Sequence, residues 1–132
     1  VAMGVVASTY AQHFQISRAA TGMLPHFDFV LTREMYGESK PAPDGYQLGL
    51  QRLGLAAAQC VAVEDSPRGL RAARAAGLEC IIVRNHMNRE HAFDDAFCVV
   101  ESSAELGAVL ASFVPGMAPA HPLPPRKLEA FL

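Results

Sequence analysis

Residues 60–70 are Cys60-Val61-Ala62-Val63-Glu64-Asp65-Ser66-Pro67-Arg68-Gly69-Leu70. A short apolar run of strand length leads into two adjacent carboxylates, and a proline at a typical first helical position follows them. Alternating α/β folds bind ligands outside the carboxyl ends of such strands. Neighbouring carboxylates repel each other unless a cation lies beside them, which favours Mg²⁺ held by Glu64 and Asp65. In the alternative, Asp65 or Ser66 only caps the helix that follows.

The composition is that of one globular domain or part of one. The chain has 132 residues, of which 51% are hydrophobic and 18% charged, so it is long enough to bury a core. A net charge of -2 without a basic stripe argues against nucleic acid as a partner. No apolar run is long enough for a membrane, and no signal peptide opens the chain. The three cysteines lack CxxC spacing, which predicts buried thiols in a reducing compartment, so we expect a cytoplasmic protein without disulfides or zinc.

Strand-like and helix-like segments alternate along residues 1–112. We expect strands at 1–7, 27–32, 60–63, 79–83 and 97–100, and helices from about 10 to 22 and at 44–53, 67–76 and 103–112. Near-continuous apolar strands joined by helices predict a three-layer α/β core of Rossmann-like type, with one parallel sheet covered by helices on both faces. Residues 113–132 are expected to form a proline-rich tail outside this core. The first strand begins at residue 1, so we expect the core to be incomplete at its N-terminal end.

Polar side chains follow three of the expected strands. Ser8 and Thr9 follow the first, Lys40 lies in the loop after the second, and Glu64 and Asp65 follow the third. A hydroxyl beside backbone N–H groups can bind phosphate oxygens, and a lysine and a carboxylate-bound Mg²⁺ can neutralise a transferring phosphoryl group. Taken singly, Ser8 could be a helix cap and Lys40 a solvated lysine. Their joint order and spacing favour a site for phosphoryl transfer.

This arrangement resembles the haloacid dehalogenase superfamily of phosphohydrolases, in the branch of β-phosphoglucomutase-like and phosphoglycolate-phosphatase-like enzymes. Three segments carry the resemblance to the second, third and fourth motifs of that family: Gly4-Val5-Val6-Ala7-Ser8-Thr9, Ser39-Lys40-Pro41-Ala42-Pro43-Asp44 and Val63-Glu64-Asp65-Ser66-Pro67-Arg68-Gly69-Leu70. The resemblance covers about residues 1–112. It implies that Ser8, with Thr9, binds phosphate, that Lys40 neutralises it and orients the nucleophile, and that Glu64 and Asp65 hold Mg²⁺. The implied activity is Mg²⁺-dependent hydrolysis of small phosphorylated metabolites through an aspartyl-phosphate.

The first motif of the family, an Asp-x-Asp segment, occurs nowhere in this sequence. Its two aspartates are the nucleophile and the acid/base. The resemblance places that strand and a cap domain before Val1, and places the strand between those ending at Ser8 and at Asp65. Without that strand, the sheet must re-pair, recruit a strand from a missing N-terminal segment or a partner chain, or stay unstable. Because the nucleophile is also missing, we expect this chain to be inactive alone. Two alternatives stay open: a non-catalytic phosphate- and metal-binding module, and a sugar-phosphate mutase of the same family.

Overall fold

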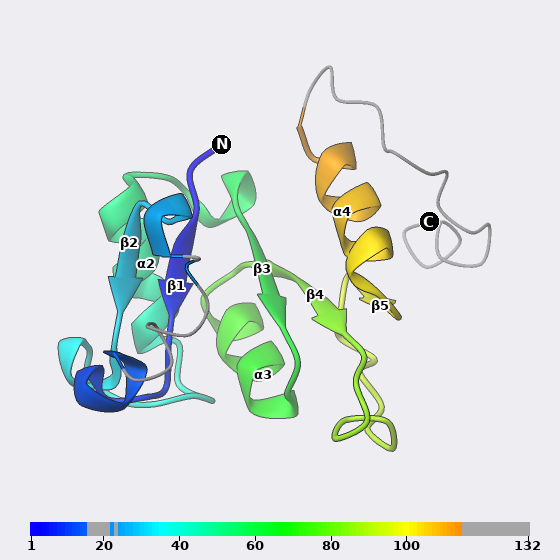
Figure 1. The fold of residues 1–132 in the computed structure, drawn as a ribbon, viewed down its shortest axis with the longest axis horizontal. Coiled ribbons are helices and arrows are strands. Elements are labelled where there is room, and N and C mark those ends of the chain that lie inside the picture. Colours follow the sequence, from blue (N-terminus) through cyan, green and yellow to red (C-terminus); the bar gives the residue numbers. More distant parts are fainter. Residues whose placement is uncertain (16–21, 23, 115–132) are drawn as a thin grey trace.

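The computed structural model describes residues 1–15, 22 and 24–114 (Figure 1). Within these residues the strands are β1 (Gly4–Val6), β2 (Phe29–Leu31), β3 (Val61–Glu64), β4 (Glu79–Val83) and β5 (Cys98–Val100). The α-helices labelled in Figure 1 are α2 (Asp44–Leu53), α3 (Pro67–Ala75) and α4 (Ser103–Ser112). Short 3-10 helices occupy Leu24–His26, Arg33–Met35 and Ala57–Gln59. Parallel strands interleaved with helices confirm the predicted α/β class.

The strands form two separate parallel sheets rather than the single sheet that the sequence predicts. One sheet pairs β1 with β2, and the other has the order β3-β4-β5. Within the described chain, β1 and β3 therefore each have a strand neighbour on one side only. Figure 1 shows these two strands as neighbours that point the same way, with no strand between them. The sheet has not closed by re-pairing, and the interruption lies where the additional strand was expected.

The three-stranded sheet carries helices on both faces, as predicted. Its central strand β4 alternates between two cores, because successive side chains of a strand point to opposite faces. Cys80 and Ile82 pack in one cluster with Leu70 of α3, and Ile81 packs in the other with Val109 of α4. The two isoleucines are fully buried, and burial of such a side chain contributes roughly 1.5–3 kcal/mol. These two cores make β3-β4-β5 the better packed of the two sheets.

The helix boundaries follow local signals in the sequence. Helix α2 spans the predicted 44–53 and ends at Gly54, whose positive φ of 65° suits a residue without Cβ. Ser66 caps α3, since its Oγ accepts a hydrogen bond from the N–H of Gly69 at 3.0 Å, and Pro67 occupies the first helical position. Asp65 is therefore not the cap.

Several predicted bounds differ from the observed ones by a few residues. Helix α4 and strand β4 have the predicted limits, whereas α3 ends at Ala75, β3 is shifted by one residue, and β1, β2 and β5 are shorter than predicted. The β1–β2 ladder has only three residue pairs, and single backbone hydrogen bonds, from Asp28 to Met3 and from Ala7 to Leu31, continue it at either end. The helix predicted from about 10 to 22 is seen at 11–15, and Gly22 is not helical. Residues 16–21, like the predicted tail after residue 114, lie outside the described residues. Across the described ranges, no helix combines the length and apolar character needed to cross a membrane.

Candidate active site

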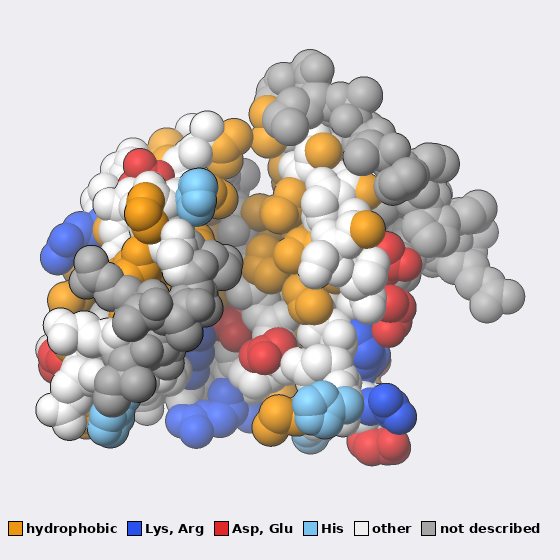
Figure 2. Space-filling view, viewed as in Figure 1, with side chains coloured by type: hydrophobic (Ala, Val, Ile, Leu, Met, Phe, Trp, Pro, Cys, Tyr) orange, Lys and Arg blue, Asp and Glu red, His pale blue; other side chains and the backbone are white. Residues whose placement is uncertain are grey.

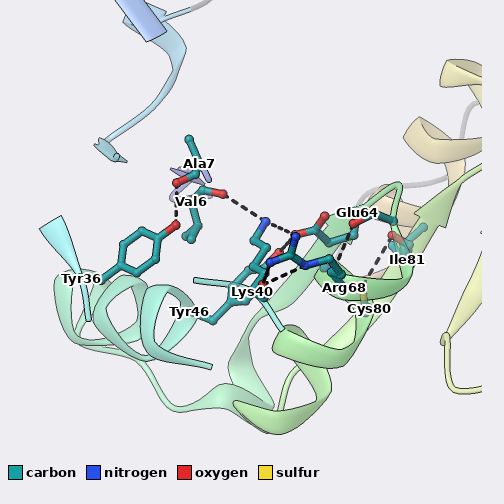
Figure 3. Close-up of polar contacts among 11 residues, drawn as sticks. Val6, Ala7, Tyr36, Lys40, Tyr46, Glu64, Arg68, Cys80 and Ile81 are labelled. Atoms are coloured by element: carbon teal, nitrogen blue, oxygen red, sulfur yellow. Dashed lines mark hydrogen bonds and ion pairs between the residues drawn. The ribbon is translucent and has the colours of Figure 1, made fainter. Parts of the chain in front are cut away.

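Lys40 and Glu64 form an ion pair at the carboxyl ends of β1 and β3. The Lys40 ammonium contacts Oε1 of Glu64, and the two side chains are only 14% and 8% exposed. The same ammonium donates a hydrogen bond to the backbone oxygen of Val6, the last residue of β1, at 3.2 Å. Because Val6 and Glu64 belong to different sheets, Lys40 links the two sheets across the interruption (Figure 3). The alternative of a solvated lysine is wrong.

Tyr46 shares this carboxylate oxygen. It lies in the first turn of α2, its hydroxyl donates to Oε1 of Glu64, and the Lys40 ammonium lies 5.2 Å from the centroid of its ring. Burial, and next the charge of Glu64, raise the pKa of Tyr46 well above its ordinary value, so the hydroxyl remains a donor at physiological pH. In the sequence, Tyr46 stands at helical spacing with Leu50 and Leu53, which indicates only an apolar helix face. The phenol hydroxyl of Tyr46 on that apolar face was the available signal for a buried polar contact.

Arg68 holds the backbone of Lys40. The Arg68 guanidinium, in the first turn of α3, donates to the carbonyl oxygen of Lys40 through Nε at 3.0 Å and also through Nη2. The lysine is thus attached to α3 at its main chain and to Glu64 at its ammonium. This role of Arg68 was not found from the sequence, because the contact joins residues 28 positions apart.

Gly69 allows α3 to approach the carboxylate of Glu64 closely. A Cβ at this position would overlap Oε2 and Cδ of Glu64. One oxygen of Glu64 therefore receives Lys40 and Tyr46, while the other lies against the first turn of α3. The carboxylate is confined on all of these sides, which explains its low exposure.

Asp65 lies beside this cluster with an exposed side chain. Its backbone oxygen accepts a hydrogen bond from Nδ2 of Asn88 at 2.8 Å, and Nδ2 of Asn85 lies 3.5 Å from its Oδ2. Asn88 is 3% exposed and also donates to the backbone oxygen of Val83 at 2.9 Å. It thereby joins the ends of β3 and β4. Neither asparagine was identified from the sequence, although the Asn85-x-x-Asn88 spacing after the strand at 79–83 was an available signal.

Ser8 and Thr9 follow β1 and are exposed. The preceding Ala7 is fixed, because its N–H donates to the backbone oxygen of Leu31 and its own oxygen accepts from the Tyr36 hydroxyl at 2.7 Å. Ser8, Lys40, Glu64 and Asp65 thus all follow the carboxyl ends of parallel strands. Within the described chain, direct contact joins Lys40 to Glu64, whereas no hydrogen bond connects Ser8, Thr9 or Asp65 to that pair.

The side chains present suit Mg²⁺ in kind but supply few ligands. Carboxylate oxygens are preferred ligands of this ion, and Asp65 offers an exposed one. Glu64 is already engaged by Lys40 and Tyr46. In the part of the chain that the structure describes, no three His, Cys, Asp or Glu side chains come together as a metal site. Most ligands of an octahedral ion would have to come from water, from substrate phosphate or from groups outside this sequence.

Comparisons with known proteins agree with the three motifs. The family model for haloacid dehalogenase-like hydrolases matches residues 1–83, a range that contains Ser8, Lys40, Glu64 and Asp65. Protein CbbY of Cereibacter sphaeroides is 42% identical over 83 residues, which are 63% of this chain and 36% of CbbY. Fructose-1-phosphate phosphatase YqaB of Escherichia coli (strain K12) is 42% identical over 66 residues, which are 50% of this chain and 35% of YqaB.

The fold is also similar to that of a solved relative. A variant of CbbY from Rhodobacter sphaeroides, crystallised in complex with xylulose-(1,5)bisphosphate, superposes with a TM-score of 0.73 at 36% identity, over 81% of this chain and 49% of that one. The chain spans about a third of the length of the two curated relatives. The family match nevertheless extends over more than half of the present sequence. The chain therefore belongs to the haloacid dehalogenase-like hydrolase family.

Proposed function

We propose that this chain supplies the phosphate- and metal-binding part of a phosphatase for small phosphorylated sugars. The observation that carries the proposal is the Lys40–Glu64 pair at the carboxyl edge of the strands, beside exposed Ser8 and Asp65. A cation and a carboxylate held near an exposed serine hydroxyl and an exposed aspartate carboxylate suit the transfer of a doubly charged phosphoryl group. The sugar phosphate class is supported by the relatives, one a fructose-1-phosphate phosphatase and one crystallised with xylulose-(1,5)bisphosphate.

Each residue has a role in this proposal. Ser8 and Thr9 bind phosphate oxygens by hydrogen bonds, and Lys40 balances the charge that moves between the attacking and leaving oxygens. Asp65, with Glu64 beside it, would hold Mg²⁺, which would supply further charge neutralisation when bound. Tyr36 and Arg68 act indirectly, by fixing the backbone at Ala7 and Lys40. An aspartyl-phosphate route would need an aspartate from outside this sequence.

We propose that this aspartate enters on a strand that inserts between β1 and β3. The facing edges of β1 and β3 lack partners in the described chain, and unpaired backbone groups favour addition of a strand. Val63 is 42% exposed although it lies within β3, and Figure 2 shows hydrophobic side chains along the hollow between the two sheets. An apolar strand would cover them. Its carboxyl end would lie near the Lys40 ammonium, which now bonds to Val6.

A second candidate is a binding module that holds phosphate without cleaving it. The absence of any Asp-x-Asp segment from the sequence favours it. Such a module would retain Ser8, Lys40 and Asp65, since these residues bind phosphate and metal without forming a covalent bond.

A fusion experiment separates the two candidates. An N-terminal segment of the kind that the family resemblance implies, with an Asp-x-Asp strand and a cap, would be joined in front of this chain. With Mg²⁺, the fusion should hydrolyse sugar phosphates, whereas the 132-residue chain should not hydrolyse p-nitrophenyl phosphate above a Lys40→Ala control. A folded fusion that binds phosphate but shows no turnover would favour the binding module. Turnover by the isolated chain, abolished in Asp65→Asn, would refute the proposal that the nucleophile lies outside it.

A further inference from the structure

We propose that Tyr46 is a positioning residue that holds the Lys40 ammonium at the end of β1 by sharing Oε1 of Glu64 with it. The catalytic meaning of this role rests on the proposed function, in which Lys40 faces the phosphate. The positioning itself is a property of this chain and can be measured without substrate or metal.

The three side chains meet from three different elements (Figure 3). Tyr46 comes from α2, Glu64 from the end of β3, and Lys40 from the loop between β2 and α2. Oε1 of Glu64 accepts from both the ammonium and the hydroxyl. The ammonium also lies over the ring of Tyr46, at 5.2 Å from its centroid, and donates to the oxygen of Val6 at 3.2 Å. The ring of Tyr46 therefore lies against the Lys40 ammonium, and the hydroxyl of Tyr46 binds Glu64, the anionic partner of that ammonium.

This arrangement restricts a side chain that is flexible by nature. Lysine carries its charge on a four-carbon stem with many rotamers, so one carboxylate does not define one position. The Tyr46 side chain has two rotatable bonds and is packed against the core formed around Ala62, Leu70 and Ile82. Its hydroxyl fixes the carboxylate oxygen, and its ring closes one side of the space around the ammonium. The charge is thereby held at Val6, two residues before Ser8.

Tyr36 offers a matched control. Tyr36 is 9% exposed, and its hydroxyl donates to the backbone oxygen of Ala7 at 2.7 Å, at the same end of β1. Tyr36→Phe therefore deletes an equivalent hydroxyl near the site without removing a contact to Lys40 or Glu64. Tyr46→Phe deletes the hydroxyl at Glu64 and retains the aromatic ring.

Acylation of lysine amines measures the freedom of Lys40 directly. The sequence contains only two lysines, Lys40 and Lys127. Both lysines would be acetylated with acetic anhydride, and the extent of modification of each would be followed by mass spectrometry. The relative acetylation rate of a lysine is its rate in the folded chain divided by its rate in the chain unfolded in guanidinium chloride. We expect Tyr46→Phe to raise the relative rate of Lys40 about tenfold, which corresponds to loss of one hydrogen bond to a charged group. The relative acetylation rate of Lys127 should not change. In Tyr36→Phe, the relative acetylation rate of Lys40 should equal that of the unmodified chain.

An NMR signature excludes a merely structural effect. In chain labelled with ¹⁵N-lysine, a paired and shielded ammonium gives a slowly exchanging Nζ–Hζ cross-peak, which Lys40→Ala would assign. Tyr46→Phe and Glu64→Gln should both lose this cross-peak while their urea midpoints show a folded chain, and Tyr36→Phe should retain it. An unchanged cross-peak and acylation rate in folded Tyr46→Phe would overturn the proposal. Equal effects of Tyr46→Phe and Tyr36→Phe would overturn it too, because they would indicate general loosening. Neither readout depends on phosphatase activity.

Discussion

Lys40 and Glu64 connect two sheets that share no strand ladder in the described chain. The ammonium reaches the carboxylate at the end of β3 and the backbone oxygen of Val6 at the end of β1. The contact spans 24 positions of sequence. One side chain therefore has a structural role across the interruption and, in the proposed function, an electrostatic role toward phosphate.

Loss of the charge on Glu64 should destabilise the chain. Glu64→Gln keeps the shape of the side chain but leaves the Lys40 ammonium without its anionic partner. Breaking a fully buried pair costs roughly 3–5 kcal/mol, and we expect about 2 kcal/mol because the Lys40 side chain retains 14% exposure and a hydrogen bond to Val6. Urea unfolding followed by circular dichroism measures this free energy. As a control, Arg74→Gln breaks the exposed pair with Glu79 and should cost less than about 1 kcal/mol. Equal losses in the two variants would contradict the structural role.

Binding of Mg²⁺ should depend on Asp65 and be opposed by Lys40. Asp65→Asn removes the exposed carboxylate and should abolish binding measured by isothermal titration calorimetry, whereas Asp94→Asn, in an exposed loop, should not. Lys40→Met removes a nearby positive charge and leaves Oε1 of Glu64 with Tyr46 as its remaining donor, so it should raise the affinity for Mg²⁺ by about tenfold. If Lys40→Met weakens binding instead, the ammonium and the metal do not compete for the Glu64 carboxylate.

Two glycine substitutions in helices should have opposite effects. Alanine is normally the better helix former, by roughly 1 kcal/mol. Gly107→Ala in α4 should therefore stabilise the chain, because a Cβ there meets nothing within 4 Å. Gly69→Ala in α3 should instead destabilise it by about 1–3 kcal/mol, since the Cβ would overlap the carboxylate of Glu64. Thermal unfolding of both variants checks the two signs, and a stabilised Gly69→Ala would show that Glu64 lies elsewhere.

Stability should fall with rising pH in part because of Cys80. Burial, reinforced by the charge of Glu64, raises the pKa of the Cys80 thiol to about 12. An unfolded cysteine has a pKa of about 8.5, so the folded state favours the neutral thiol. This contribution is complete below about pH 8.5 and is lost as pH rises toward 12. The urea midpoint of the unmodified chain should therefore fall more steeply between pH 8 and 10.5 than that of Cys80→Ala. Parallel slopes would mean that the thiol is not shielded.

The sequence predicted a helix or strand well where the residues that signal it lie within a few positions of one another. The apolar positions and Gly54 predicted α2 to the residue, and the run 79–83 predicted the buried strand β4. Helix periodicity, strand hydrophobicity and caps act over one or two turns, so no tertiary contact is needed to recognise them. The order of Ser8, Lys40 and Glu64–Asp65 likewise placed them at the carboxyl edge of parallel strands, because chain direction alone determines which end of a strand they follow.

Tertiary packing decided the partners of these residues. The sequence left open whether Asp65 or Ser66 caps α3, and the Ser66 contact to Gly69 settled it. Tyr46 and Glu64 lie 18 positions apart and Asn88 and Asp65 lie 23 apart. Such contacts depend on how α2 and the loop after β4 pack against β3, which no local periodicity encodes. By itself, the sequence therefore determined which residues lie at the edge of the strands, whereas the packing of separate elements decided that Lys40, Tyr46 and Glu64 form one cluster across two unjoined sheets.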